Sequence, residues 1–294
     1  MKNLVVFGDS YSDVNYVWDG GLPWPAYVQK YSDVKVFPYA TSGGTCSNKI
    51  IEKPYPSVFE HQFPQYLEDK RSGKTNPPIK DTLFTLWIGT NDIGVGGLLD
   101  TSGALPGGST LVDTSACVAH WVESMYDNGA RNFLIHNIVP LENNILYSAD
   151  TYPNFFWTGD HNATHWNLEI RQLAETSNAL TSLMLTELAP RLKDAHIGLF
   201  DSHALFRDIL AKPSVYLNGT GPMELRQPAK RCEYKPNVDV ATAKPVCTLV
   251  PASDADNHVW YDELHPSEQV NRVIAREIVR VTSGQSSTWT RWIL

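Results

Sequence analysis

The sequence predicts an α/β protein in which a mostly parallel sheet is covered by helices on both faces. Short, nearly continuous apolar runs are typical of strands that are buried on both faces. Longer segments with helical spacing alternate with these runs, and that alternation favours parallel βαβ units. The chain has 294 residues, of which 42% are hydrophobic and 19% are charged. This size and composition predict a single domain, residues 1–294, that buries a substantial core.

Five segments have the apolar, β-branched composition of buried strands, and we expect them to form a five-stranded sheet. Each is short enough for a strand and is bounded by polar or turn-forming residues. They are Asn3–Phe7, Val34–Tyr39, Thr82–Ile88, Asn132–Asn137 and His196–Phe200.

Four longer segments repeat apolar residues near helical spacing and are predicted to be helices. Pro64 lies inside the first of them, and proline interrupts helix interiors. Gly129 directly follows the second, as is common beyond a helix C-terminus. The four segments are Ser57–Asp69, Ser115–Asn128, Thr164–Leu188 and Pro266–Val281.

Two segments break this rhythm and are expected to be long loop insertions, at about residues 93–110 and 211–260. The first is rich in glycine and the second contains six prolines. Loops of this length in a compact domain are often functional. Ligand sites of open α/β sheets lie beyond the carboxyl ends of the strands, where such loops emerge. A role as solvent-exposed decoration is an equal alternative.

The charge pattern argues against nucleic-acid and membrane partners. The formal net charge is -8, and no basic run exceeds two residues. Phosphate backbones and anionic lipid surfaces both attract clustered Lys and Arg. The chain also contains no apolar run near the ~20 residues that span a bilayer.

Glycosylation sequons and cysteines favour an extracellular protein. Asn162 and Asn218 each begin an Asn-x-Ser/Thr sequon. The apolar stretch that follows Met1 is too short for a signal peptide, so we expect a leader that is absent from this sequence. The alternative is an intracellular protein with chance sequons.

The chain has four cysteines, an even number that permits full disulfide pairing. Cys232 and Cys247 bracket a short segment without regular periodicity and are a candidate disulfide. Closing a loop of that size contributes roughly 3 kcal/mol. The pairing of Cys46 and Cys117 stays open, and buried thiols are the alternative for all four.

Ser10 is the candidate nucleophile. It follows the first strand in the segment Gly8-Asp9-Ser10, which places a hydroxyl at the carboxyl edge of the sheet. A helix is expected to begin here, and its N-terminus would favour developing negative charge. The chain has no Gly-x-Ser-x-Gly elbow, which excludes the α/β-hydrolase arrangement. Taken alone, Ser10 is better explained as a helix cap.

Asp262 and His265 are the candidate acid and base. A serine hydroxyl needs a base to take its proton, and histidine titrates near neutral pH. A carboxylate then orients the imidazole and stabilises the cation that forms. Asp262 stands three residues before His265 in a turn that ends at Pro266, so both side chains can face one point. The alternative is a surface turn before a helix.

Two further segments are candidates for an oxyanion hole. Gly43 and Gly44 follow the second strand, where glycine lets a backbone N–H approach a substrate closely. Asn91 follows the third strand and offers a neutral amide donor. Ordinary strand-to-loop turns are the alternative for both segments.

Taken together, these four segments resemble the four sequence blocks of the GDSL, or SGNH, hydrolases. The resemblance runs from residue 5 to residue 267 and implies a three-layer α/β/α, flavodoxin-like fold. It implies that Ser10 is nucleophile and first oxyanion donor, with Gly43 and Asn91 as the other donors. His265 is then the base and Asp262 the acid. Because Gly43 and Gly44 are adjacent, the second donor can be off by one.

Within this family the chain resembles fungal acetylesterases of carbohydrate esterase family sixteen. The grounds are the Gly-Asp-Ser-Tyr-Ser-Asp segment, where Tyr11 replaces the leucine of the family name, and Trp-Tyr-Asp-x-x-His-Pro near the end. This resemblance implies a secreted monomer that removes acetyl groups from hemicellulose-derived sugars by exo-deacetylation. It implies no metal and no organic cofactor. The alternatives are a lipase or longer-chain esterase, and a carbohydrate-binding protein with a vestigial triad.

Residues beside the catalytic segments are candidates for substrate binding. Flat aromatic faces suit sugar rings, and polar-tipped aromatics suit a wet cleft. Ordinary core packing is the alternative for the aromatic residues. The candidates are Asp9, Tyr11, Trp24, Gly44 and Trp260, and Trp18 lies close to the same segments.

Overall fold

The computed structural model describes residues 1–105 and 108–293, and it contains a six-stranded sheet in the order β2-β1-β3-β4-β5-β8. Residues 106 and 107, which belong to the expected 93–110 insertion, and residue 294 lie outside this description. The first five strands of the order are parallel, and β8 runs antiparallel to β5. The strands are β1 (Asn3–Gly8), β2 (Lys35–Pro38), β3 (Thr82–Trp87), β4 (Asn132–His136), β5 (His196–Phe200) and β8 (Thr290–Trp292).

All five predicted strands are therefore present, but the prediction of five strands in total is wrong. The sixth, β8, has only three residues, too few for an alternating pattern to mark it. Trp292 pairs with Gly198 of β5. A side chain on Gly198 would contact the Trp292 ring at 3.2 Å, so the glycine makes room for this edge strand.

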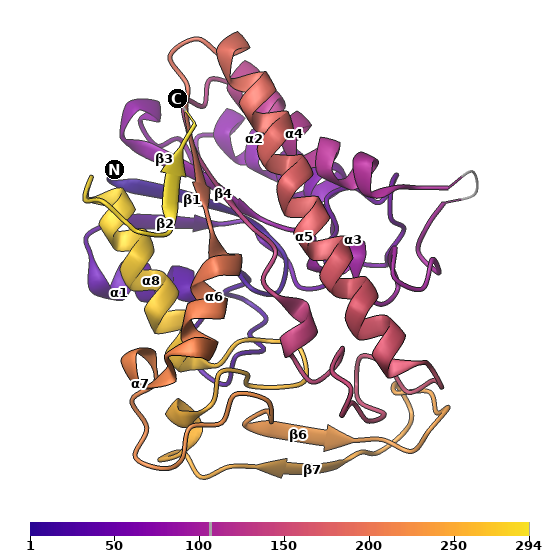
Figure 1. Ribbon diagram of the computed structural model, residues 1–294. Helices are drawn as coiled ribbons and strands as arrows, with labels where there is room; N and C mark the ends of the chain where they lie inside the picture. The colour runs from indigo at the N-terminus through magenta and orange to yellow at the C-terminus, as the bar shows by residue number, and fades with distance from the viewer. Residues whose placement is uncertain (106–107, 294) are drawn as a thin grey trace.

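Helices cover both faces of the sheet, which confirms the predicted three-layer α/β/α fold (Figure 1). Residues alternate along β1, so that Leu4 and Val6 face one apolar core while Val5 and Phe7 face the other. The helices α1 (Trp24–Tyr31), α6 (Ser202–Ala211) and α8 (Glu268–Thr282) pack on the first face, and α2 (Phe63–Arg71) and α4 (Leu111–Asp127) pack on the second. The long helix α5 (Ala163–Leu188) contributes its start to the first core and its end to the second.

Three predicted helices begin at least two residues from their expected starts, and one of these, α8, begins at Glu268 rather than at Pro266. The segment expected as one helix over Ser57–Asp69 is a π-helical turn, Val58–Gln62, followed by α2. Pro64 lies in the first turn of α2, where its missing N–H costs nothing. Helix α4 begins four residues earlier than expected because Thr110 and Asp113 form a capping box. The short helices α3 (Thr90–Ile93) and α7 (Pro213–Tyr216), and helices α1 and α6, were not among the predicted elements.

Part of the second insertion, residues 211–260, forms a hairpin that projects beyond the sheet (Figure 1). Strands β6 (Lys230–Glu233) and β7 (Val246–Leu249) pair antiparallel, and Cys232 lies directly opposite Cys247. The predicted disulfide between these two cysteines is present. Short 3₁₀ turns complete the elements, at Ile79–Asp81, Leu141–Asn143, Ala189–Arg191 and Ala255–Asn257.

Across the part of the chain that is described, none of the helices has both the length and the apolar content that crossing a bilayer requires.

Candidate active site

Ser10 lies just beyond the end of β1, where the backbone of Gly8 passes close to the backbone of β3. A Cβ atom on Gly8 would lie 2.3 Å from the carbonyl oxygen of Trp87, and the Gly8 φ angle is 150°. Only glycine fits this contact. After it the chain makes a tight turn, in which the Ser12 N–H donates to the Asp9 carbonyl at 3.0 Å. The expected helix after Ser10 is absent, since the next helix begins at Trp24.

Gln62 fixes the backbone just before the nucleophile. Its Oε1 accepts a hydrogen bond from the Gly8 N–H at 3.0 Å, and its Nε2 donates to the Gly8 carbonyl at 2.8 Å. The side chain comes from the π-helical turn Val58–Gln62, a distortion that is frequent at functional sites. No feature of the sequence distinguished Gln62 from any other helical glutamine.

The structure brings Ser10, His265 and Asp262 into one hydrogen-bonded chain. The Ser10 Oγ and His265 Nε2 atoms lie 2.7 Å apart. On the other side of the ring, His265 Nδ1 lies 2.9 Å from Asp262 Oδ2 and 3.1 Å from Oδ1. The exposed fractions of the three residues are 6%, 2% and 5%. A buried hydroxyl–imidazole–carboxylate chain is the arrangement that activates a serine for nucleophilic attack.

The turn that carries Asp262 and His265 is held by hydrogen bonds from both directions. Asp262 Oδ1 accepts the backbone N–H groups of Leu264 at 2.8 Å and His265 at 2.6 Å. The buried Tyr11 hydroxyl donates to the Leu264 carbonyl at 2.9 Å. Because Tyr11 follows Ser10 directly, this bond ties the turn to the nucleophile across the whole length of the chain.

Three donors converge on the same cleft as Ser10. Among the residues described, the backbone N–H groups of Ser10 and Gly43 have no hydrogen-bond partner. The Gly44 N–H donates to the Thr41 carbonyl at 3.0 Å, and one amide hydrogen of Asn91 is directed to the Gly44 carbonyl at 3.0 Å. Gly44 is therefore already satisfied, and the neighbouring Gly43, with φ 75°, is the glycine whose N–H is free.

Asp13 joins the loop after Ser10 to the turn that contains Gly43. Its Oδ2 accepts the Ser42 N–H at 2.8 Å and the Ser42 hydroxyl at 2.9 Å. Its Oδ1 accepts the N–H groups of Asn15 at 2.8 Å and Tyr16 at 3.1 Å. One buried carboxylate thus sets the position of two loops that border the cleft.

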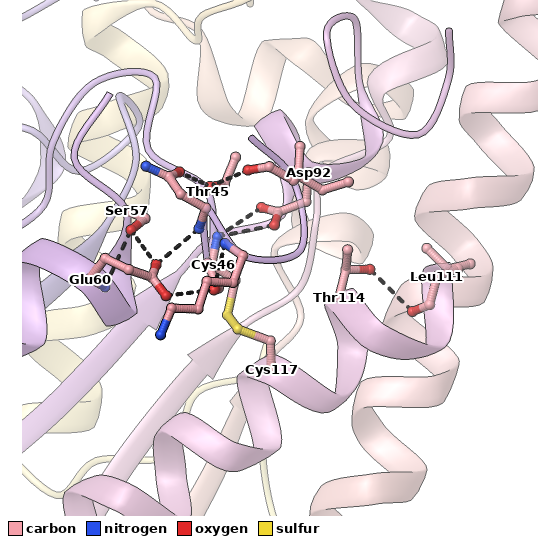
Figure 2. The surroundings of a disulfide bond; sticks show 12 residues. Thr45, Cys46, Ser57, Glu60, Asp92, Leu111, Thr114 and Cys117 are labelled. Atoms are coloured by element: carbon pink, nitrogen blue, oxygen red, sulfur yellow. Dashed lines mark hydrogen bonds between the residues drawn. A yellow bond between two sulfur atoms is a disulfide. The ribbon is translucent and has the colours of Figure 1, made fainter. Parts of the chain in front are cut away.

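The disulfide between Cys46 and Cys117 braces the segment around Asp92, the residue after Asn91 (Figure 2). It ties the loop after β2 to helix α4. The Cys46 N–H is directed to both carboxylate oxygens of Asp92, at 3.0 and 3.2 Å. Burial raises the pKa of Asp92 to about 6, while this N–H and the Lys53 ammonium act in the opposite direction.

Asp9 is a buried carboxyl group behind the nucleophile. Its Oδ1 accepts the Tyr11 N–H at 3.0 Å, and its Oδ2 has no partner among the described residues. Burial raises the pKa of Asp9 to about 7, and the nearby carboxyl groups of Asp92 and Asp13 add to the effect.

Several predicted substrate-binding residues are core residues instead. Tyr11, Trp24, Trp260 and Asp9 have exposed fractions of 0%, so none of them presents a surface to a ligand. Trp24 uses its indole N–H internally, donating to the Ser12 hydroxyl at 3.1 Å. For the three aromatic residues, this is the core-packing alternative that the sequence left open. Gly44 does not line the cleft either.

The cleft over Ser10 has a volume of about 760 Å³ and an aromatic wall. Four of the wall residues come from two loops that were not predicted to meet, one after Ser10 and one before α5. A sequence signal for them was weak, because single aromatic residues in loops are common. They are Tyr16, Trp18, Phe155 and Phe156.

This fold, with a buried hydrogen-bonded chain of Ser10, His265 and Asp262 beyond the ends of its strands, has the arrangement that is typical of serine hydrolases. The chain belongs to the GDSL-like lipase/acylhydrolase family, whose model matches residues 4–278. The protein is a carboxylic ester hydrolase of that family.

Relatives of the chain include an acetylesterase and a hemolysin. It is 28% identical to an acetylesterase of Hypocrea jecorina, over 99% of this chain and 91% of the relative. It is 22% identical to the thermolabile hemolysin of Vibrio parahaemolyticus, over 97% of this chain and 64% of the relative. A solved carbohydrate esterase aligns with 98% of this chain and 66% of its own, with 12% identity and a TM-score of 0.46.

Proposed function

We propose that this protein hydrolyses acetyl esters through an acyl-enzyme on Ser10. The observation that carries the proposal is the 2.7 Å contact between Ser10 Oγ and His265 Nε2, with Asp262 bonded to the far side of the same ring. A catalytic base must lie within this reach of the proton that it removes.

In the acylation step, Ser10 Oγ attacks the ester carbonyl carbon while His265 Nε2 takes the hydroxyl proton. The carbonyl oxygen becomes an oxyanion, which the N–H groups of Ser10 and Gly43 and the Asn91 amide stabilise. The bond to the alcohol oxygen then breaks, and His265 gives its proton to that oxygen. The alcohol leaves, and the acyl group stays on Ser10.

Deacylation repeats these events with water as the nucleophile. His265 takes a proton from water as the water oxygen attacks the acyl carbon. The same three donors hold the second oxyanion. When the bond to Ser10 Oγ breaks, His265 returns the proton to Ser10, and the carboxylic acid leaves.

We propose acetylated, hemicellulose-derived sugars as the substrates, with exo-deacetylation as the mode of attack. The acetylesterase relative supports the acetyl group as the acyl part. The cleft combines aromatic side chains with polar ones such as Asn91 and Lys53. Aromatic faces pack well on sugar rings while polar side chains bond to hydroxyl groups.

We propose that the protein is an extracellular, glycosylated monomer. Both sequon asparagines are exposed. Asn162 uses its side-chain oxygen to cap α5, which leaves its amide nitrogen available for a glycan. Two disulfides are compatible with an oxidising compartment.

Two substrates of different acyl length test the proposed specificity. The kcat/KM for p-nitrophenyl acetate is expected to exceed that for the octanoate ester, and acetylated xylo-oligosaccharides are expected to lose acetate, as seen by product analysis. The Ser10→Ala variant is the control for background hydrolysis. A large preference for octanoate would mean a lipase or longer-chain esterase, and binding of the oligosaccharide without release of acetate would mean a vestigial site.

A further inference from the structure

Three aromatic rings enclose the His265 imidazole, and only one of them lies flat against it. The Trp18 ring is stacked on the imidazole, with centroids 5.5 Å apart and planes inclined by 13°. Phe156 lies at 5.6 Å but is tilted by 54°, and Tyr11 meets the imidazole at 5.7 Å and 62°. Trp18 therefore presents its π face to the ring of the catalytic base.

We propose that Trp18 is a positioning residue for the base, and that its π face stabilises the His265 imidazolium that forms when Ser10 loses its proton. This inference rests on the proposed role of His265. A cation within about 6 Å of an aromatic face is attracted by the ring quadrupole, and tryptophan gives the strongest attraction.

The burial of His265 explains why this contact matters. The residue is 2% exposed, so water solvates the imidazolium poorly. Asp262 compensates for the charge in the plane of the ring, through Nδ1. Trp18 acts from a different direction, perpendicular to that plane. The two contributions are therefore independent, and loss of Trp18 leaves the hydrogen-bonded chain in place.

The titratable groups around His265 do not duplicate this effect. Ser10 and Asp262 are its hydrogen-bond partners, and Tyr11 contacts it through the ring edge. Asp19, next to Trp18, is fully buried, and burial together with the charge of Asp262 raises the pKa of Asp19 well above its ordinary value. Burial therefore disfavours the charged form of Asp19.

The loop that carries Trp18 is held at both ends. Asp13 accepts the N–H groups of Asn15 and Tyr16 at its start. At its other end, the Leu22 N–H donates to Glu268 Oε1 at 2.9 Å. Trp18 also packs on Phe155 at 5.4 Å. The indole is therefore placed before a substrate arrives, as a contribution to a developing cation requires.

Fluorinated tryptophans, incorporated at position 18 alone, test this inference at nearly constant shape. Each fluorine weakens the negative potential of the ring face. Because a stabilised imidazolium keeps its proton to higher pH, fluorination is expected to move the acidic limb of the kcat/KM profile to lower pH, in proportion to the number of fluorines. With p-nitrophenyl acetate, the total shift is expected to be roughly 0.4–1.5 pH units, and plateau kcat/KM is expected to fall roughly 3- to 30-fold.

Trp157 is the matched control, because it lines the same cleft but packs on Trp166 and His161 rather than on His265. The same fluorines at position 157 are expected to leave the acidic limb in place. Trp18→Leu keeps apolar bulk but has no π face. It is expected to move the acidic limb to lower pH by about as much as the most fluorinated tryptophan does.

If fluorination at position 18 left the acidic limb of the kcat/KM profile in place, the inference would be overturned. If Trp18 only shields His265 from water, opening the site in Trp18→Ala would move the limb to higher pH and the fluorine series would stay flat. The proposed roles of Ser10 and His265 are tested separately, since they fail if Ser10→Ala or His265→Ala keeps the activity of the wild type, whatever the fluorine series shows.

Discussion

Among single residues, the buried Asp9 carboxyl makes the clearest pH prediction. Its pKa in the folded protein, about 7, lies above the ordinary value of 3.8. The folded state therefore holds this proton more tightly than the unfolded state does. Its contribution to stability is fully present below about pH 4 and is lost as pH rises through about 7. The free energy of unfolding of the wild type should therefore decline between about pH 4 and 7. We predict that Asp9→Asn flattens this decline and raises the free energy of unfolding at pH 8 by up to about 4 kcal/mol.

Urea unfolding at several pH values between 4 and 8 measures this effect. The exposed Asp33 offers a matched control, because Asp33→Asn removes a carboxyl group that stays in water. If the free energy of unfolding of Asp9→Asn varied with pH as steeply as that of the wild type, Asp9 would already be ionised in the folded protein over this pH range.

The sequence singled out the three side chains that the structure brings into one hydrogen-bonded chain, but it did not single out the residues that contact them. Ser10, Asp262 and His265 lie in short motifs whose residue types and spacing imply a chemistry. Gln62 and Trp18 act through contacts made across the fold, and a glutamine or a tryptophan alone implies no chemistry. Trp24 and Trp260 show the reverse error. They lie near catalytic residues in sequence, yet burial places them in the core.

At the scale of elements, the two disulfides are expected to differ in importance. Cys232 and Cys247 are 15 residues apart, whereas Cys46 and Cys117 are 71 residues apart. The chain-entropy model gives about 3 kcal/mol for the shorter loop and about 4 kcal/mol for the longer one. The Cys46 N–H also donates to Asp92, next to Asn91, the proposed oxyanion donor.

We therefore predict that replacing Cys46 and Cys117 together by serine lowers both Tm and kcat, whereas replacing Cys232 and Cys247 lowers Tm less and leaves kcat for p-nitrophenyl acetate nearly unchanged. Thermal unfolding and steady-state kinetics on the two double variants measure this difference. Equal losses of kcat in both variants would contradict the bracing role assigned to the Cys46–Cys117 bond.

Elements with strong periodicity were predicted better than short or irregular ones. Helix α5 begins and ends within one residue of the expected Thr164–Leu188, since it repeats its apolar pattern over many turns. Strand β8 has too few residues for a pattern, β6 is mostly polar, and β7, although it contains Val246 and Leu249, is exposed along its whole length. The π-helical turn before α2 depends on tertiary contacts, such as the one from Gln62 to Gly8.

At the scale of the whole molecule, the parallel sheet explains how distant motifs form one site. Strands β1 and β3 are neighbours and end at the same edge, so Ser10 and Asn91 emerge side by side. Helix α8 packs against α1 on the same face of the sheet (Figure 1), which returns the 262–265 turn to the end of β1. The alternation of strands and helices predicted this convergence, because it fixes where the strand ends lie.

The most direct test of the account is reaction of the protein with a fluorophosphonate, followed by intact mass measurement and peptide mapping. We predict a single adduct on Ser10 and none in Ser10→Ala. Labelling is expected to be at least about 100-fold slower in His265→Ala. It is expected to be unchanged in His258→Gln, because His258 bonds to the Gln227 carbonyl away from the cleft. An adduct on another residue, or labelling of Ser10 at an equal rate without His265, would show that the two ends of the chain do not form a nucleophile and its base.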